Sequence, residues 1–255
     1  MAPTRDPSPV IHLIQLAGGK GLRAGRGPGS APKQFRETGR GPLFTVSLRT
    51  FLDGGEEHGY RVGSVTVVVP TAWRETAKQA LTLLMAGHDD IPRSLAEAGA
   101  SRTGSTWNAL SRLANEEAGW PVIANLELVA IHDAARPFAS AALLGRLVAA
   151  AAENGSAVPG IPVIDTVVQT ADSPGSAPVR YLPRETLSAV QTPQVFRWDL
   201  CLEAHRWAAA QGAEFTDDGG LLAARGHPPV VVPGEQENWK VTTEAQWERA
   251  RDILA

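Results

Sequence analysis

Near its start this chain reads Val10-Ile11-His12-Leu13-Ile14-Gln15-Leu16-Ala17-Gly18-Gly19-Lys20-Gly21-Leu22-Arg23, an apolar run that passes directly into a glycine-rich loop. The apolar run is typical of a buried β-strand. Between Lys20 and Arg40, six basic side chains stand against a single acid, Glu37. Glycines let backbone N–H groups approach a polyphosphate, and cations neutralise its charge. The segment therefore predicts a strand that ends in a phosphate-binding loop.

The composition of the whole chain marks this basic loop as a local site. The 255 residues are 43% hydrophobic, enough to bury a full core in one α/β domain. The formal net charge is -3 and the pI is about 6.1. A protein of this charge is not expected to bind nucleic acid or anionic membranes non-specifically. The loop's cations are therefore expected to serve one specific anionic ligand.

Several features indicate a cytoplasmic protein. Cys201 is the single cysteine, so no internal disulfide can form and no oxidising compartment is required. No apolar run approaches the ~18 residues of a membrane span. Residues 1–9 are rich in proline and lack the apolar centre of a signal peptide, so we expect a flexible tail.

Beyond the first strand, strand-like apolar runs alternate with helical stretches. This alternation predicts an α/β fold, a Rossmann-like and mostly parallel sheet flanked by helices, in a single domain over 10–255. Further strands are expected at 65–69, 94–96, 126–131, 157–164 and 229–232. Helices are expected at 44–52, 71–85, 102–117, 139–153, 200–211, 218–224 and 243–254.

The segment 166–196 departs from this alternation. Two extended runs, Val167–Thr170 and Pro178–Leu182, flank the turn-rich Asp172-Ser173-Pro174-Gly175-Ser176. This pattern indicates a hairpin arm. A two-stranded arm cannot bury both faces on its own domain, so we expect it to pack on a second subunit as the dimerisation element of a homodimer. A mobile lid is the alternative.

Ligands of open parallel sheets bind at the carboxyl ends of the strands. The segments that follow the expected strands should therefore converge: the glycine-rich loop, Pro32-Lys33-Gln34, His132–Pro137 and Asp165-Thr166. Gly19-x-Gly21-x-x-Ala24 satisfies the dinucleotide fingerprint formally. However, prolines delay the helix, and no acid ends the second strand to hold a ribose. A Walker A sequence is absent.

An ordered set of further motifs resembles one family of nucleotidyltransferases, the 2-C-methyl-D-erythritol 4-phosphate cytidylyltransferases of isoprenoid biosynthesis. The resemblance covers nearly the whole chain from Leu13. The motifs are Leu16-Ala17-Gly18-Gly19-Lys20-Gly21-Leu22-Arg23 with Lys33, Gly99-Ala100-Ser101-Arg102-x-x-Ser105, His132-Asp133-Ala134-Ala135-Arg136-Pro137, Pro162-Val163-Ile164-Asp165-Thr166, Gln191-Thr192-Pro193-Gln194-x-Phe196, Thr216-Asp217-Asp218 and Lys240-Val241-Thr242.

The resemblance implies a reaction in which CTP and methylerythritol phosphate give the CDP-alcohol and pyrophosphate, with Mg²⁺ or another divalent cation. It implies that Arg23 and Lys33 stabilise the transition state. Arg184 and Lys240 would hold the attacking phosphate monoester, and whether Arg184 is donated across a dimer stays open. Transfer between two anions needs positioning and positive charge more than a covalent nucleophile.

The resemblance also implies a set of substrate-binding residues. Asp133 would contact substrate hydroxyls or the metal region, and His132 beside it is expected to be a packed imidazole rather than a base. Asp217-Asp218 fits a metal pair and helix N-capping equally well, so the direct metal ligands stay undefined. The expected substrate-binding residues are Ala17, Gly18, Gly19, Gly21, Gly99, Arg102, Ser105, Asp133, Arg136, Thr166 and Thr192.

One departure from the family pattern concerns the acceptor. Val168 stands where the methylerythritol enzymes often carry lysine, and aliphatic residues occur there in related ribitol 5-phosphate cytidylyltransferases. The alternatives are therefore ribitol 5-phosphate, or another polyol or sugar phosphate, as acceptor. A non-catalytic nucleotide-binding regulator is an alternative of a different class.

Overall fold

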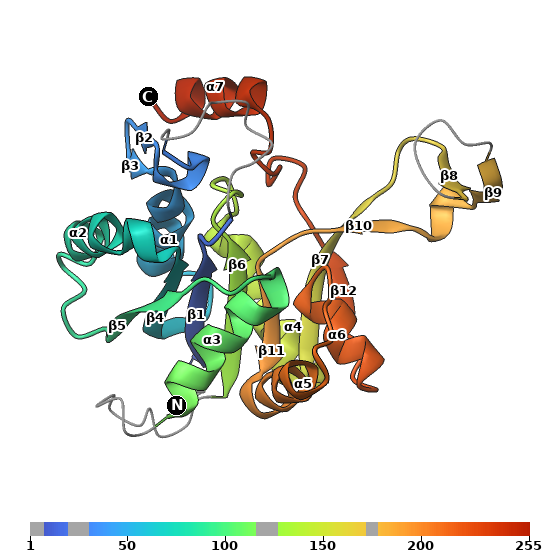
Figure 1. The fold of residues 1–255 in the computed structure, drawn as a ribbon, viewed down its shortest axis with the longest axis horizontal. Coiled ribbons are helices and arrows are strands. Elements are labelled where there is room, and N and C mark those ends of the chain that lie inside the picture. Colours follow the sequence, from blue (N-terminus) through green and yellow to red (C-terminus); the bar gives the residue numbers. More distant parts are fainter. Residues whose placement is uncertain (1–7, 20–30, 116–126, 172–177) are drawn as a thin grey trace, which may run out of the picture.

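A computed structural model describes residues 8–19, 31–115, 127–171 and 178–255 (Figure 1). Its centre is an eight-stranded sheet with the order β10-β7-β11-β6-β1-β4-β5, in which β12 also pairs with β7. The strands of this sheet are β1 (Val10–Leu16), β4 (Arg61–Val69), β5 (Arg93–Glu97), β6 (Leu128–Asp133), β7 (Ser156–Pro162), β10 (Ser188–Val190), β11 (Gln194–Arg197) and β12 (Val230–Pro233). Two small hairpins accompany it, β2 (Glu37–Thr38) with β3 (Gly41–Pro42) and β8 (Val167–Thr170) with β9 (Pro178–Leu182).

Helices pack on both faces of the sheet, which confirms the predicted α/β class. They are α1 (Leu43–Asp53), α2 (Arg74–Leu84), α3 (Arg102–Ala114), α4 (Ala141–Asn154), α5 (Trp198–Gln211) and α6 (Asp218–Ala224), whereas α7 (Glu244–Ile253) packs on α1. Short 3₁₀ turns are η1 (Lys33–Phe35), η2 (Thr71–Trp73) and η4 (Arg184–Thr186). Among the described residues, none of these helices is long and apolar enough to cross a bilayer.

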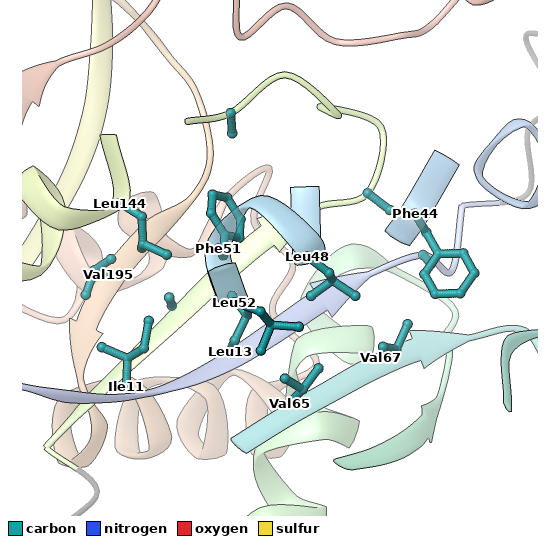
Figure 2. Close-up of a cluster of buried hydrophobic side chains, with 14 of the residues drawn as sticks. Ile11, Leu13, Phe44, Leu48, Phe51, Leu52, Val65, Val67, Leu144 and Val195 are labelled. Atoms are coloured by element: carbon teal, nitrogen blue, oxygen red, sulfur yellow. The ribbon is translucent and has the colours of Figure 1, made fainter. Parts of the chain in front are cut away.

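Successive side chains of β1 point to opposite faces of the sheet, so this one strand contributes to the hydrophobic cores on both faces. Ile11 and Leu13 face one side, where they pack with Phe44 and Phe51 of α1 and with residues of α2 and α4 (Figure 2). Ile14 faces the other side, which α3, α5 and α6 cover. A strand buried on both faces reads as a continuous apolar run, as the sequence of β1 does.

Most pairings in the sheet are parallel, as expected, but β11 runs antiparallel to both β6 and β7. Sequence analysis did not identify β10 or β11, because the segment 166–196, which was assigned to the arm, contains all of β10 and all but the last residue of β11. Val195 and Phe196 of β11 are fully buried, so apolar burial holds this part of the segment in the central sheet.

The hairpin formed by β8 and β9 projects away from the body of the molecule (Figure 1). It is a separate two-stranded sheet. Val179 and Tyr181 on β9 are 66% and 68% exposed. The turn residues 172–177, like the tail 1–7, lie outside the described residues.

Candidate active site

Two adjoining cavities open beyond the carboxyl ends of β1 and β6. The larger cavity, of about 700 Å³, is lined by the end of β1, by Lys33 of η1 and by the start of α3. The smaller cavity, of about 330 Å³, is lined by Arg136 after β6, by Gln191 and Thr192 between β10 and β11, and by Asp217 before α6, among others. Arg102, Asp133 and Lys240 line both cavities and are called the shared wall below.

The shared wall is a network of charges. Lys240 Nζ donates to Asp133 Oδ2 over 2.6 Å, and Arg102 Nε lies 3.4 Å from Asp133 Oδ1. Burial alone would raise the pKa of Asp133, but Arg102 and Lys240 outweigh it and hold this pKa well below its usual range. Burial alone would lower the pKa of Arg102, but Asp218 and Asp133 outweigh it and raise that pKa. Asp133 and Arg102 are therefore charged at neutral pH.

Hydrogen bonds behind the wall fix the end of β6. The backbone N–H of Asp133 donates to Thr192 Oγ1 over 3.0 Å, and His132 Nδ1 lies 3.1 Å from the same oxygen. His132 Nε2 lies 2.9 Å from the Arg136 carbonyl. Burial lowers the pKa of His132 to about 4, so the imidazole is neutral at pH 7. His132 therefore supports the backbone and lines neither cavity.

The flanks of the glycine-rich loop are held by Gln34. Its Nε2 donates to the carbonyls of Ala17 (2.8 Å) and Gly19 (2.7 Å). Ala17 is buried beneath the cavity, whereas Gly18 and Gly19 line it. A Cβ at Gly18 would stand 2.6 Å from the Ala98 Cβ, so this close approach requires glycine. Sequence analysis quoted Gln34 in a motif but assigned it no role.

The start of α3 forms another side of the larger cavity. The Gly99 N–H donates to Ser105 Oγ over 3.0 Å, and this hydroxyl donates to the Ser101 carbonyl over 2.8 Å. Ser101 caps α3 by accepting from the Gly104 N–H. Gly99, Arg102 and Ser105, all expected to bind the nucleotide, thus lie together in this cavity.

Comparison with known proteins identifies the family. The model of the family IspD, 2-C-methyl-D-erythritol 4-phosphate cytidylyltransferase, matches residues 11–255. The chain belongs to this family.

Individual IspD relatives agree with this assignment. The 2-C-methyl-D-erythritol 4-phosphate cytidylyltransferase of Geobacillus kaustophilus is 36% identical, over 96% of this chain and 96% of that protein. A bifunctional enzyme IspD/IspF from Rhodopseudomonas palustris is 37% identical over 100% of this chain and 57% of that enzyme. The chain therefore spans a little over half the length of such bifunctional relatives.

Solved structures share the architecture. The crystal structure of the 2-C-methyl-D-erythritol 4-phosphate cytidylyltransferase of Thermus thermophilus superposes with a TM-score of 0.68 and 29% identity, covering 98% of this chain and 99% of that one. A 4-diphosphocytidyl-2C-methyl-D-erythritol synthase from Anaerococcus prevotii gives a TM-score of 0.74 at 24% identity, over 98% and 99%, and supports the fold.

Some residues that the IspD resemblance assigns to the site do not reach it within the single chain. Thr166 and Arg184 are exposed at the base of the arm and line neither cavity. Arg184 Nη1 donates to the Ile164 carbonyl over 2.5 Å. Gly21 and Arg23 lie outside the described residues, so their roles stay predictions.

Asp217 and Asp218, which are adjacent in the sequence, bond to different groups in the structure. Asp217 caps α6 by accepting from the Gly220 N–H over 3.0 Å, and it also accepts from Gln194 Nε2 over 2.7 Å. Asp218 is 1% exposed, and its Oδ2 lies 2.7 Å from Arg102 Nη1. The two carboxylates are thus engaged with different groups. Within the described residues, no cluster of three or more His, Cys, Asp or Glu side chains could hold a metal ion.

Proposed function

We propose that this chain transfers the cytidylyl group of CTP to 2-C-methyl-D-erythritol 4-phosphate and releases pyrophosphate. The observation that carries the proposal is the pair of adjoining cavities with a shared charged wall, in a chain that belongs to the IspD family over residues 11–255. The larger cavity, beside the glycine-rich loop, would take the nucleotide. The smaller cavity would take the acceptor.

The proposed chemistry follows from the charges around these cavities. An oxygen of the acceptor's phosphate attacks the α-phosphorus of CTP, and the bond to the leaving pyrophosphate breaks. Two anions must therefore meet, and negative charge grows on the α-phosphate oxygens. Lys33 lines the larger cavity and would stabilise that charge, together with Arg23 of the loop. Lys240 lines both cavities and would hold the acceptor's phosphate at their junction.

The proposal includes Mg²⁺ as the divalent ion. Mg²⁺ is usually bound by one or two carboxylates together with substrate phosphates, rather than by a cage of protein ligands. Asp133 supplies one carboxylate to the larger cavity, so the residues present fit an ion that arrives with the triphosphate. Bound there, Mg²⁺ would neutralise phosphate charge, and Asp133 is the residue that would hold it.

A homodimer built through the arm completes the proposal. The exposed Val179 and Tyr181 on β9 give the arm an apolar surface that a second subunit could cover. Arg184 lines neither cavity of its own chain. Donation of Arg184 to the smaller cavity of the partner would bring a further cation to the acceptor's phosphate.

Pyrophosphate release tests the function directly. Purified protein is given CTP and Mg²⁺ with methylerythritol phosphate, ribitol 5-phosphate or no acceptor. We expect release with methylerythritol phosphate. Release with ribitol 5-phosphate alone would identify ribitol 5-phosphate as the acceptor, the alternative that Val168 suggests. No release with any acceptor, from protein that still binds CTP, would favour a nucleotide-binding regulator.

A further inference from the structure

Two lysines that line the larger cavity, among the described residues, come from opposite ends of the chain. Lys33 belongs to η1, near the N-terminus, and Lys240 precedes α7 near the C-terminus. The rate of a transfer reaction depends on the placement of its groups to within about 1 Å. Some contact must therefore set the position of the η1 segment relative to the C-terminal segment.

Arg36, the residue directly after η1, makes such a contact. Its Nη1 donates to both carboxylate oxygens of Glu244 in α7, over 3.0 and 2.8 Å. The Arg36 side chain is only 11% exposed. Its guanidinium also lies over the Trp247 ring of α7, 5.4 Å from the ring centroid. An arginine that is bound by a carboxylate and packed on an aromatic ring has little freedom to move.

Arg36 is joined equally firmly to the segment that carries Lys33. Its Nε donates to the Ala31 carbonyl over 3.3 Å, and its backbone N–H donates to the Lys33 carbonyl over 3.2 Å. These two bonds tie Arg36 to the segment just before η1 and to the first residue of η1. A shift of Arg36 would therefore carry Lys33 with it.

Glu244 is joined in the same way to the segment that carries Lys240. It is the first residue of α7, which begins directly after Lys240-Val241-Thr242-Thr243. The Val241 N–H donates to the Ala135 carbonyl over 2.8 Å, and the Val241 side chain packs with Trp247 in a separate buried cluster. Lys240 and α7 thus form one unit.

We propose that the Arg36–Glu244 ion pair is a positioning brace that sets Lys33 relative to Lys240. The inference rests on the proposed transferase activity. Neither Arg36 nor Glu244 lines either of the two cavities described above, so both act through their neighbours and not on the substrate. A purely structural ion pair would stabilise the docking of α7 and leave the rate of transfer unchanged in folded protein.

Single and double variants test the brace. The variants are Arg36→Ala, Glu244→Gln and the two combined, with Arg36→Lys as the conservative change. We expect each of the first two to lower kcat at least about tenfold, with a smaller change in the KM for CTP. Because both changes break one contact, the combined variant should lose no more than the worse single variant. Arg36→Lys keeps the charge and should recover part of kcat.

The matched control is the surface pair of Arg197 and Asp199, which is far more exposed and lines neither cavity. Arg197→Ala and Asp199→Asn should leave kcat at the wild-type value. All rates are compared for protein that is folded at the assay temperature, as judged from its Tm. Unchanged kcat in Arg36→Ala and Glu244→Gln, or losses that multiply in the combined variant, would overturn the brace.

A second measurement tests the brace independently of the proposed function. Native-state hydrogen exchange follows the Phe35 and Arg36 amides, which donate to the carbonyls of Pro32 and Lys33. Their exchange should quicken about tenfold in Glu244→Gln and stay unchanged in Asp199→Asn. Equal exchange rates of these amides in wild type and Glu244→Gln would contradict the brace, whether or not the protein shows transferase activity. If wild type shows no turnover but exchange is faster in Glu244→Gln, the brace is supported and the proposed function is contradicted.

Discussion

Lys33 lines the larger cavity from the turn η1. Gln34 bonds this turn to the Ala17 carbonyl, and Arg36 bonds it to the Ala31 carbonyl. A cation that acts mainly on charge developed in the transition state should affect kcat more than binding. We therefore expect Lys33→Ala to lower kcat by about 100-fold and to change the KM for CTP much less. Steady-state kinetics of pyrophosphate release measure both constants.

The control for Lys33→Ala is Lys78→Ala, the same change at an exposed position of α2. It should leave both constants unchanged. A kcat of Lys33→Ala equal to that of wild type would remove the proposed transition-state role. A raised KM with unchanged kcat would reassign Lys33 to nucleotide binding alone.

Asp218 is buried next to the shared wall and forms an ion pair with Arg102, one of its three residues. Burial alone would raise its pKa, but Arg102 and then His205 outweigh burial and lower this pKa to about 2. A folded pKa below the unfolded value of about 3.9 contributes stability above that value, and the contribution is lost as the pH falls toward 2. The Asp218 charge should thus stabilise the fold fully at pH 7.

Asp218→Asn should accordingly lower the free energy of unfolding at pH 7 by on the order of 3 kcal/mol, because it leaves Arg102 buried beside a neutral amide. The difference from wild type should shrink as the pH falls from about 4 to about 2. Urea unfolding at several pH values measures it. The exposed Asp90→Asn serves as control. A difference that is the same at every pH would contradict the assigned charge of Asp218.

At the scale of elements, several of the expected helices and strands are confirmed with close boundaries. Helix α6 begins and ends at the residues that the sequence indicated, and α4 ends before Gly155, which has a φ of 86°. Glycine at that position is a strong local stop signal. Strand β11 was missed because four residues carry too little pattern, and its antiparallel direction is set by pairing with β6 and β7.

The arm composed of β8 and β9 is the element whose role can be tested by itself. If a second subunit covers its apolar side chains, wild-type protein should sediment as a dimer at micromolar concentration. Tyr181→Ser should shift the equilibrium toward monomer, because it removes a large exposed ring from the proposed interface. Leu83→Ser on α2, also highly exposed, should have no such effect. A monomeric wild type would leave the arm as a lid.

At the scale of the whole molecule, donation of Arg184 across the dimer predicts complementation between two inactive variants. Lys33→Ala and Arg184→Ala are mixed after dissociation and allowed to reassociate. Each mixed dimer then holds one complete site, with Lys33 from one chain and Arg184 from the other. About a quarter of wild-type activity should return from an equal mixture. If Arg184 serves its own chain, mixing should restore nothing.

The amino-acid sequence was enough to predict the fold class, the position of the glycine-rich loop and most of the residues that meet in the two cavities. It could do so because local patterning reports strands and helices, and because the carboxyl ends of parallel strands share one edge. Gly18, Lys33 and Asp133 were therefore expected at one site from the strand order, whereas Gly99 and Lys240 were assigned to it by the resemblance to the family.

Which of these charges pair depends on how the helices and strands pack together. Spacing along the chain carries no distance between residues that are far apart in sequence, so the contact of Asp218 with Arg102 and that of Arg36 with Glu244 could not be read from it. The packing of α6 on α5, of α5 on α3 and of α7 on α1 brings these groups together, and each largely buried guanidinium then needs its carboxylate partner.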